Sequence, residues 1–395
     1  AVRSAQGIIN LALMTGNIGR PGTGANSITG QCNAMGSRAF SNTTGLYGGG
    51  EYTDENRRKV VAEALDIDEK ILPTKPTLPY NVIIDKINSG EIKALWIVAT
   101  NPIVSWINNL DFKKAAEKLE FLVVQDIYSD TDTARYCDLF LPSTNGLKKE
   151  GVIINTERRL SKLDPVLPKM ENELSDYDIA LGIGEALGMG KLLDKWRTPE
   201  IAFNTIKQCT KGTPCDITGV TYENLKNSRG IQWPFREGEK LETDERRLFE
   251  DKHFYTASGK AKFIYEDIDE SEYKPNEKYP YLLNTGRAIV GQWHTLTRTR
   301  EIPDVYAISI KDAYINMNPD LAEELEIADN DKVKVISSNG VVNTFIVKLT
   351  RTVKKYDLFA PIHYIEVNSV LPSVFDKYSK EPSFKYVSVN IEKVD

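Results

Sequence analysis

Residues 94–142 read ALWIVATNPIVSWINNLDFKKAAEKLEFLVVQDIYSDTDTARYCDLFLP, and this stretch decides the fold. Three short apolar runs, ALWIVAT (94–100), FLVVQD (121–126) and DLFLPS (138–143), alternate with segments of helical character. Strands that are apolar along nearly their whole length are typical of a parallel sheet covered on both faces. The stretch therefore predicts an α/β fold with a Rossmann-like parallel-sheet region.

The residues before this stretch predict two helices and a long glycine-rich segment. YNVIIDKINSG (80–90) has the pattern of an amphipathic helix that a glycine ends, and residues 5–14 have helical apolar spacing. The glycine- and asparagine-rich run that follows, to about residue 50, is either a flexible segment or backbone shaped against a ligand.

Past Tyr279 the pattern changes to short β runs. The best helix among them, NPDLAEELE (318–326), has Asn318 as its expected N-cap, and SSNG (337–340) has the composition of a hairpin turn. Several short strands with one good helix predict a compact β-barrel of roughly 115 residues. The β runs are YPYLLNT (279–285), KVKVISS (332–338), GVVNTFIVKL (340–349) and DLFAPI (357–362).

Between these parts the chain is heavily charged and weakly periodic. We expect a solvated connection with a few helices and a β-hairpin near FYTASGKAKFIYED (254–267). The predicted organisation is an α/β region over 1–187, a connecting region over 188–278 and a C-terminal barrel over 279–395.

Composition excludes several classes of protein. The formal net charge of −6 argues against a nucleic-acid partner, because phosphate binding favours a basic face. No apolar run approaches the roughly 20 residues of a membrane helix, so we expect no membrane span. The cysteines are widely spaced and are expected to be reduced, buried thiols rather than a disulfide framework or a zinc site. They are Cys32, Cys137, Cys209 and Cys215.

Polar residues follow the predicted parallel strands at the edge where such sheets bind ligands. Asn101 follows the first strand, and Gln125 with Asp126 ends the second. Amides and a carboxylate there suit a purine edge and a ribose diol, but Asn-Pro and Asp are also common turn residues. Lys148 and Lys149, beyond the third strand, could face an anion or lie in a solvated turn.

The segment TGRAIVGQWHTLTRTR (285–300) concentrates hydrogen-bond donors and cations. Thr285 and the backbone at the glycine turn could cradle a phosphate. Threonines and arginines alternate over 295–300, which predicts a half-buried edge strand. Arg298 and Arg300 could attract an anion, or serve the cofactor or the surface. The histidines, His253, His294 and His363, are expected to be packed or solvated rather than metal-binding.

Taken in order, the motifs of this chain resemble the C-terminal half of the molybdopterin-dependent oxidoreductases, most closely the assimilatory and periplasmic nitrate reductases. The likeness covers nearly all of the chain. The motifs are GNIGRPGTG, TGQCNAMGSR, ATNPIVSW, VVQDIYSDTDTARYCDLFLPS, KKEGVIINTERR, SDYDIA, FYTASGKAKF, TGRAIVGQWHTLTRTR and FKYVSVN.

The resemblance implies a molybdenum-bis(molybdopterin guanine dinucleotide) cofactor, a double-psi-type barrel, and a 4Fe–4S cluster in a missing N-terminal part. By position, the sheet-edge residues would hold one guanine nucleotide, and a loop at the start of the barrel would wrap the second pterin and its diphosphate. The implied cofactor-binding residues are Asn101, Gln125, Asp126, Lys149, Asp176, Thr285, Gly286, Arg287, Trp293, His294, Thr295, Asn368 and Lys385.

The resemblance also implies a function. The complete protein would reduce nitrate to nitrite, with electrons from a ferredoxin-like or NAD(P)H-linked donor, and the cytoplasm is the default location. Its N-terminal half would carry the iron–sulfur cluster and the metal ligand, so this chain alone is expected to be inactive. The alternatives are a formate dehydrogenase of the same family and a structural subunit that has lost the cofactor.

Overall fold

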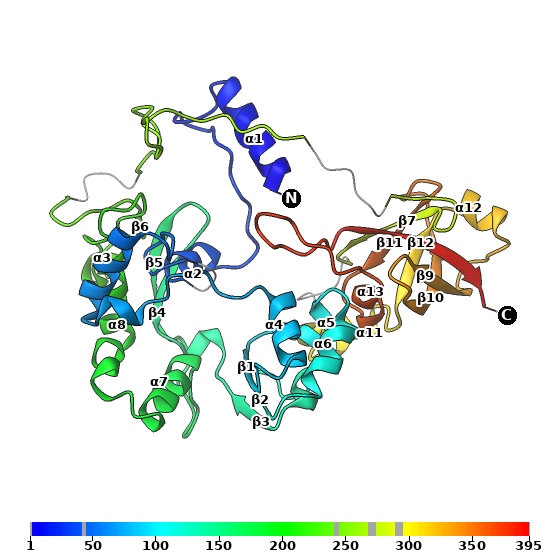
Figure 1. Ribbon diagram of the computed structural model, residues 1–395, viewed down its shortest axis with the longest axis horizontal. Coiled ribbons are helices and arrows are strands. Elements are labelled where there is room, and N and C mark those ends of the chain that lie inside the picture. Colours follow the sequence, from blue (N-terminus) through cyan, green and yellow to red (C-terminus); the bar gives the residue numbers. More distant parts are fainter. Residues whose placement is uncertain (1, 42–44, 241–244, 268–273, 289–294, 395) are drawn as a thin grey trace. The chain divides into compact units, whose positions relative to one another are not determined.

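The computed structural model describes residues 2–41, 45–240, 245–267, 274–288 and 295–394. The chain forms two compact units (Figure 1). The first comprises Ala1–Val2, Pro79–Pro142 and Asp267–Asp395, and the second comprises Arg3–Leu78 and Ser143–Glu266. Among the described residues, no helix combines the length and the apolar character that a membrane crossing requires.

A three-stranded parallel sheet, in the order β1-β2-β3, opens the first unit. Its core side chains, which include Leu122, Val124 and Phe112, lie between the sheet and two helices. Helix α4 ends before Gly90, whose positive φ of 78° suits a glycine. The α/β prediction is thus confirmed. The elements are α4 (Tyr80–Asn88), β1 (Ala94–Val98), α5 (Pro102–Ser105), α6 (Asn109–Ala116), β2 (Phe121–Asp126), η2 (Ala134–Tyr136) and β3 (Leu139–Pro142).

The rest of the first unit is a closed barrel with strand order β10-β8-β11-β7-β12-β9, as predicted. The β10–β8 and β11–β7 pairs are parallel and the other pairs are antiparallel, consistent with a double-psi-type barrel. Asn318 caps α12 by accepting from the Asp320 N–H at 2.9 Å. The elements are β7 (Tyr281–Gly286), α10 (Thr297–Arg300), α11 (Pro303–Ala307), β8 (Tyr314–Met317), α12 (Pro319–Glu324), β9 (Lys332–Ser337), β10 (Val342–Leu349), β11 (Asp357–Pro361), α13 (Ile365–Ser369) and β12 (Tyr386–Lys393).

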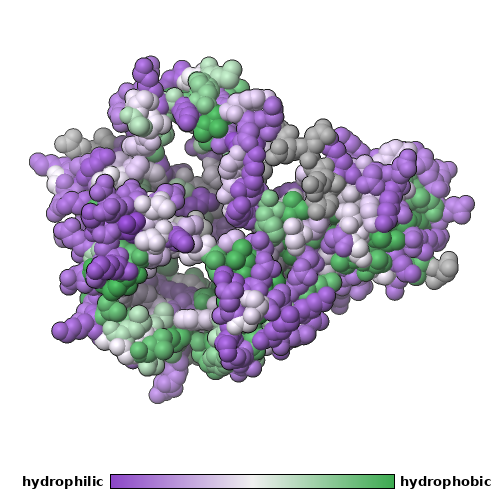
Figure 2. Space-filling view, viewed as in Figure 1, coloured by the Kyte–Doolittle hydropathy of each residue, from purple (hydrophilic) through white to green (hydrophobic). Residues whose placement is uncertain are grey.

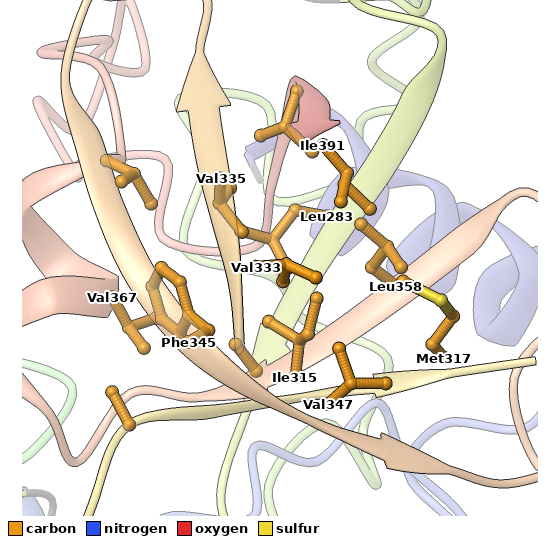
Figure 3. Close-up of a cluster of buried hydrophobic side chains, with 14 of the residues drawn as sticks. Leu283, Ile315, Met317, Val333, Val335, Phe345, Val347, Leu358, Val367 and Ile391 are labelled. Carbon is orange, nitrogen blue, oxygen red and sulfur yellow. The ribbon is translucent and has the colours of Figure 1, made fainter. Parts of the chain in front are cut away.

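The barrel interior is filled by side chains and is not a channel. Figure 3 shows Phe345, Ile315 and Val347 meeting side chains from the other strands. These residues are fully buried, because alternate positions of each strand face inward. Any ligand of the barrel must therefore bind at its ends or in its loops.

The second unit contains an antiparallel sheet, β4-β5-β6, and several helices. Helix α7 begins with a capping box between Ser175 and Asp178. The apolar side chains of α1, at the top of Figure 2, include exposed Ile8 and Leu11. The elements are α1 (Val2–Met14), α2 (Ala34–Ala39), α3 (Glu55–Leu65), η1 (Glu69–Ile71), η3 (Gly146–Lys148), β4 (Gly151–Ile154), β5 (Arg159–Leu163), α7 (Asp176–Ala186), η4 (Gly190–Trp196), α8 (Pro199–Cys209), α9 (Tyr222–Lys226) and β6 (Ile231–Gln232).

Two predictions for the charged middle of the chain are wrong. Residues 254–267 contain no strand: a tight turn, in which the Phe254 N–H donates to the Gly259 oxygen at 2.9 Å, replaces the hairpin. The region is also less solvated than predicted, because Phe203, Ile217 and Leu225 are buried against β4 and β5. Buried apolar residues spread over short elements leave only a weak periodic signal in the sequence.

The glycine-rich run near the N-terminus is shaped in part against its own unit. A Cβ on Gly48 would lie 2.3 Å from the Cys209 oxygen, and one on Gly19 would lie 2.2 Å from the Phe249 oxygen. Both glycines also have positive φ, so larger residues would be excluded twice over.

The four cysteines are free, as predicted, but the prediction that all four are buried is wrong. Cys209 is buried, and burial raises the pKa of its thiol to about 11. Cys32 is exposed, while Cys137 and Cys215 are partly buried.

Candidate functional site

The polar residues at the carboxyl edge of the parallel sheet lie together. The Ala99 N–H, just past β1, donates to the Gln125 oxygen at 2.8 Å, which joins the ends of β1 and β2. Asp126 ends β2, is buried, and accepts from the Tyr128 N–H at 3.1 Å. A buried carboxylate at this edge keeps acceptor capacity for the hydroxyl or amine groups of a ligand.

Asn101 lies at the same edge, but its side chain is engaged within the fold. Its Oδ1 accepts from the Thr133 N–H at 3.0 Å and from the Thr133 hydroxyl at 2.6 Å. Its Nδ2 donates to Asp132 at 3.3 Å. Asn101 therefore holds the 132–133 segment against the end of β1, which shapes the edge.

Arg300 joins this network from the barrel part of the chain, a role that sequence reasoning missed. Its Nη1 lies 3.6 Å from the Asp132 carboxylate. The clustered acidic residues in SDTDTAR were a signal for a cation partner, but nothing in the sequence indicated which arginine. Arg300, the last residue of α10, thus links that helix to the segment beside the end of β1, and its pairing with Asp132 makes it less available to an incoming anion.

The predicted edge strand over 295–300 is wrong, because residues 297–300 form α10. The alternation in the sequence corresponds to an alternation in burial: Thr295, Thr297 and Thr299 are buried, while Arg298 and Arg300 are exposed. The Thr295 and Thr297 hydroxyls lie 2.8 Å apart and satisfy each other. Trp293 and His294, predicted cofactor contacts, lie outside the described residues.

The end of β7 carries the second group of predicted residues. The Thr285 N–H donates to the Lys385 oxygen at 2.9 Å and its hydroxyl donates to the Phe384 oxygen, so both donors serve the barrel. Gly286 packs closely on the barrel wall, since a Cβ there would lie 2.8 Å from the Phe359 ring. Thr285 thus fixes the position of Lys385.

Arg287 and Lys385 are the cations of this group. Both are exposed, and among the described residues neither side chain makes an ion pair or a hydrogen bond. Exposed cations left unpaired beside ordered backbone suit a phosphate, because charge-assisted hydrogen bonds to phosphate are among the stronger ones.

The backbone that leads out of β7 is held by the loop after β11. The Ile362 N–H donates to the Gly286 oxygen at 2.8 Å, and the Ala288 N–H donates to the His363 Nε2 at 3.0 Å. His363 is buried, so of the two environments expected for the histidines, packed or solvated, it has the packed one. Arg287 is therefore flanked on both sides by anchored backbone.

Asn368 lies in α13 and connects the barrel to the parallel sheet. Its Nδ2 donates to the Val104 oxygen at 2.7 Å and to the Ile362 oxygen at 2.9 Å, while its own backbone oxygen accepts from the Asn108 N–H at 2.9 Å. Its Oδ1 is buried and has no hydrogen-bond partner among the described residues. Asn368 thus ties the Ile362 loop to helix α5 and keeps one unused acceptor.

Lys149 and Asp176, in the second unit, pair with each other. Beside them, Lys148 lies 2.7 Å from Glu173. Hydrogen bonds from Lys148, from the Thr144 hydroxyl and from the Met170 N–H lower the pKa of Glu173 to about 2. Lys148 therefore takes part in a local ion pair instead of a solvated turn.

We expect Glu173→Gln to reduce stability at neutral pH and to reduce it less in acid. The lowered pKa means that ionised Glu173 stabilises the folded state above about pH 4.5, and this contribution is lost as the pH falls towards 2. Urea unfolding between pH 7 and pH 3 measures it: the gap in unfolding free energy between wild type and variant should narrow as the pH falls towards 3. Glu63→Gln, at an exposed carboxylate without a described ion pair, should show no such gap. A pH-independent gap for Glu173→Gln would contradict the prediction.

Comparison with known proteins places this arrangement in a family. Residues 3–186 match the family described as molybdopterin oxidoreductase, and residues 281–388 match the molydopterin dinucleotide binding domain. The chain belongs to the molybdopterin oxidoreductases. Arg287, Lys385 and all of the barrel except the end of β12 fall within the second match, and the Asn101–Asp126 edge falls within the first.

Similar proteins differ in their reactions. The F420-dependent formate dehydrogenase subunit alpha of Methanocaldococcus jannaschii is 34% identical over all of this chain, which covers 56% of that protein. The assimilatory nitrate reductase catalytic subunit of Bacillus subtilis is 30% identical over 98% of the chain and 54% of its own length. The chain thus spans about half the length of these curated relatives.

A solved structure shares the fold. Acetylene hydratase from Pelobacter acetylenicus superposes with a TM-score of 0.63 at 14% identity, over 87% of this chain and 50% of that chain. At this level of identity the likeness concerns the fold alone.

Proposed function

We propose that this chain is the cofactor-binding C-terminal part of a longer molybdenum oxidoreductase that reduces nitrate to nitrite. The observation that supports it best is the presence of two exposed cations, Arg287 and Lys385, which make no ion pair with the residues that the structure describes and lie in the segment that matches the dinucleotide binding domain. A dinucleotide carries a diphosphate, and the arrangement of these cations on anchored backbone fits that charge.

The residues of this chain would bind and orient the cofactor. Arg287 and Lys385 would hold a diphosphate, Asp126 would accept from a ribose or a base, and Asn368 Oδ1 would accept one further donor. When bound, a molybdopterin cofactor supplies two-electron redox chemistry, and the protein contributes binding, orientation and electrostatics. Among the described residues no cluster of three or more His, Cys, Asp or Glu could hold a metal.

The second candidate is formate oxidation in the same family. It is supported by the Methanocaldococcus jannaschii formate dehydrogenase subunit, 34% identical over the whole chain. The residues proposed to bind the cofactor do not distinguish nitrate reduction from formate oxidation, because the same cofactor would serve either reaction. For nitrate reduction, the electron donor would be a ferredoxin-like or NAD(P)H-linked protein.

One experiment tests the proposal. The longer polypeptide, purified with its cofactor, is assayed with nitrate and reduced dye and, in parallel, with formate and oxidised dye. Nitrate reduction supports the proposal, whereas formate oxidation alone supports the second candidate. A preparation without molybdenum, tungsten or pterin would favour a structural subunit. The 395-residue chain assayed alone should be inactive, and dye-linked nitrate reduction by it would contradict this.

A further inference from the structure

Strands β7 and β11 of the barrel run parallel and in register up to their last residues, where Pro361 lies opposite Gly286. Beyond that pair, the Ile362 N–H donates to the Gly286 oxygen at 2.8 Å. In a parallel ladder each residue bonds to the two neighbours of the residue opposite it. A continued ladder would therefore next join the Ala288 N–H to the Ile362 oxygen.

Two side chains replace that bond. The Ala288 N–H donates instead to the His363 Nε2 at 3.0 Å. The Ile362 oxygen accepts from the Asn368 Nδ2 at 2.9 Å. Strand β7 accordingly ends at Gly286. The backbone stops being part of the ladder after that residue, yet a side-chain acceptor still holds the Ala288 amide.

The acceptor, His363, is itself held firmly and is 1% exposed. Its neighbour Ile362 is anchored by the bond to the Gly286 oxygen. Its other neighbour, Tyr364, is buried and donates its hydroxyl hydrogen to the Ile310 oxygen. An Nε2 that accepts a hydrogen bond is unprotonated, so the bond to the Ala288 amide requires the neutral imidazole. His363 is thus a fixed and uncharged acceptor.

The two bonds to this loop restrain the backbone of Arg287 from both sides. Each peptide unit is planar, so a bond to one of its atoms restrains the orientation of the whole unit. The unit before Arg287 is held through the Gly286 oxygen, and the unit after it through the Ala288 N–H. The φ and ψ angles of Arg287 lie between these two units. They are therefore restrained, and with them the direction in which the Arg287 side chain leaves the backbone.

We propose that His363 is a positioning residue for the diphosphate site: its neutral Nε2 holds the Ala288 amide and so directs Arg287 towards the phosphate groups. This role rests on the proposed function, because the diphosphate is the ligand proposed for Arg287. Lys385, the other cation of the site, offers an internal comparison. Its backbone oxygen accepts from the Thr285 N–H at 2.9 Å, so its backbone is held without the His363 side chain.

Hydrogen exchange tests the anchor without any ligand. The exchange rate of the Ala288 amide is measured in the 395-residue chain for the wild type, His363→Leu and His363→Gln. Leucine removes the acceptor, whereas the side-chain oxygen of glutamine can take the place of Nε2. We expect exchange about tenfold faster with leucine and close to the wild-type rate with glutamine. An Ala288 amide that exchanges equally fast in all three proteins would overturn the proposal.

Binding of guanosine diphosphate, which carries a diphosphate, tests the effect on Arg287. Its dissociation constant is measured by calorimetry for the same three proteins, and His363→Leu is repeated in Arg287→Ala and Lys385→Ala backgrounds. We expect His363→Leu to weaken binding about tenfold and His363→Gln to weaken it about twofold or less. The effect of His363→Leu should vanish without Arg287 and persist without Lys385, because changes that act through one residue are not additive.

The matched control is Asn318→Ala, which removes the cap of α12 from the same barrel and should leave the dissociation constant unchanged. Two results would overturn the positioning role while the proposed function stands. In the first, His363→Leu binds guanosine diphosphate as tightly as the wild type does. In the second, His363→Leu weakens binding equally with and without Arg287. A wild-type chain that does not bind guanosine diphosphate would remove the diphosphate site, and the positioning role with it.

Discussion

Reversing the charges of Arg287 and Lys385 together is expected to strip the dinucleotide cofactor from the longer protein. Hydrogen bonds to charged groups contribute about 1.5–3 kcal/mol each, and each 1.4 kcal/mol is a factor of ten in affinity. Replacing two attractive charges with two repulsive ones beside a diphosphate should therefore lower cofactor content at least tenfold. Molybdenum and pterin analysis of the purified Arg287→Glu/Lys385→Glu protein measures this.

The matched control makes the same number of charge reversals at barrel positions outside the proposed diphosphate site. Lys332 and Lys354 are exposed barrel lysines with no ion pair among the described residues, and Lys332→Glu/Lys354→Glu should retain the cofactor. In the 395-residue chain without cofactor, both double variants should unfold at a temperature close to that of the wild type, because exposed unpaired charges contribute little to stability. Full cofactor occupancy in the Arg287/Lys385 variant would remove the diphosphate assignment.

The fold was predictable where the sequence signal is periodic and local. The run that ends at Val98 is apolar throughout, and FLVVQD is apolar up to its last two residues. The barrel runs alternate, so the two kinds of strand could be told apart from the pattern. The segment 295–300 failed because a single helical turn with buried threonines produces the same alternation as an edge strand. Four residues are too few for the two periods to be told apart.

The candidate site was only partly predictable, because its contacts are made with distant backbone. Asn101 and Asp126 could be placed at one sheet edge from strand ends alone. The partners of Asn368 are the Val104 and Ile362 oxygens, the first of them 264 residues away in sequence. Every residue offers a backbone oxygen, so no residue type marks such a partner. Only the resemblance pointed to Asn368, as a cofactor contact, and its tie to α5 needed the structure.

The tie between sheet and barrel leads to the second large effect: Asn368→Asp should be more damaging than Asn368→Ala at neutral pH. Asn368 is 1% exposed, and its Nδ2 donates to two backbone oxygens. Alanine leaves those oxygens without that donor, at a cost of about 1–3 kcal/mol. An aspartate would aim an ionised oxygen at them, and an uncompensated buried charge costs about 3–5 kcal/mol.

The two variants should also differ in their dependence on pH. Burial beside carbonyl oxygens raises the pKa of the introduced carboxyl, and the neutral acid can donate one hydrogen bond. The stability of Asn368→Asp should therefore be highest below the unfolded-state pKa of about 3.9 and should be lost as the pH rises through the raised folded-state pKa. The stability difference between Asn368→Ala and wild type should not depend on pH. Urea unfolding at pH 5 and pH 8 measures this.

Asn88→Asp is the control for the same chemical change at an exposed position. The Asn88 Oδ1 accepts from Lys118 at 2.7 Å, so a carboxylate there keeps its partner and should cost little at either pH. If Asn368→Asp were as stable as wild type at pH 8, the amide could not be holding the Ile362 loop against α5. The loop that anchors Gly286 and Ala288 around Arg287 would then need another support, and the geometry proposed for the diphosphate would lose its connection to the sheet edge.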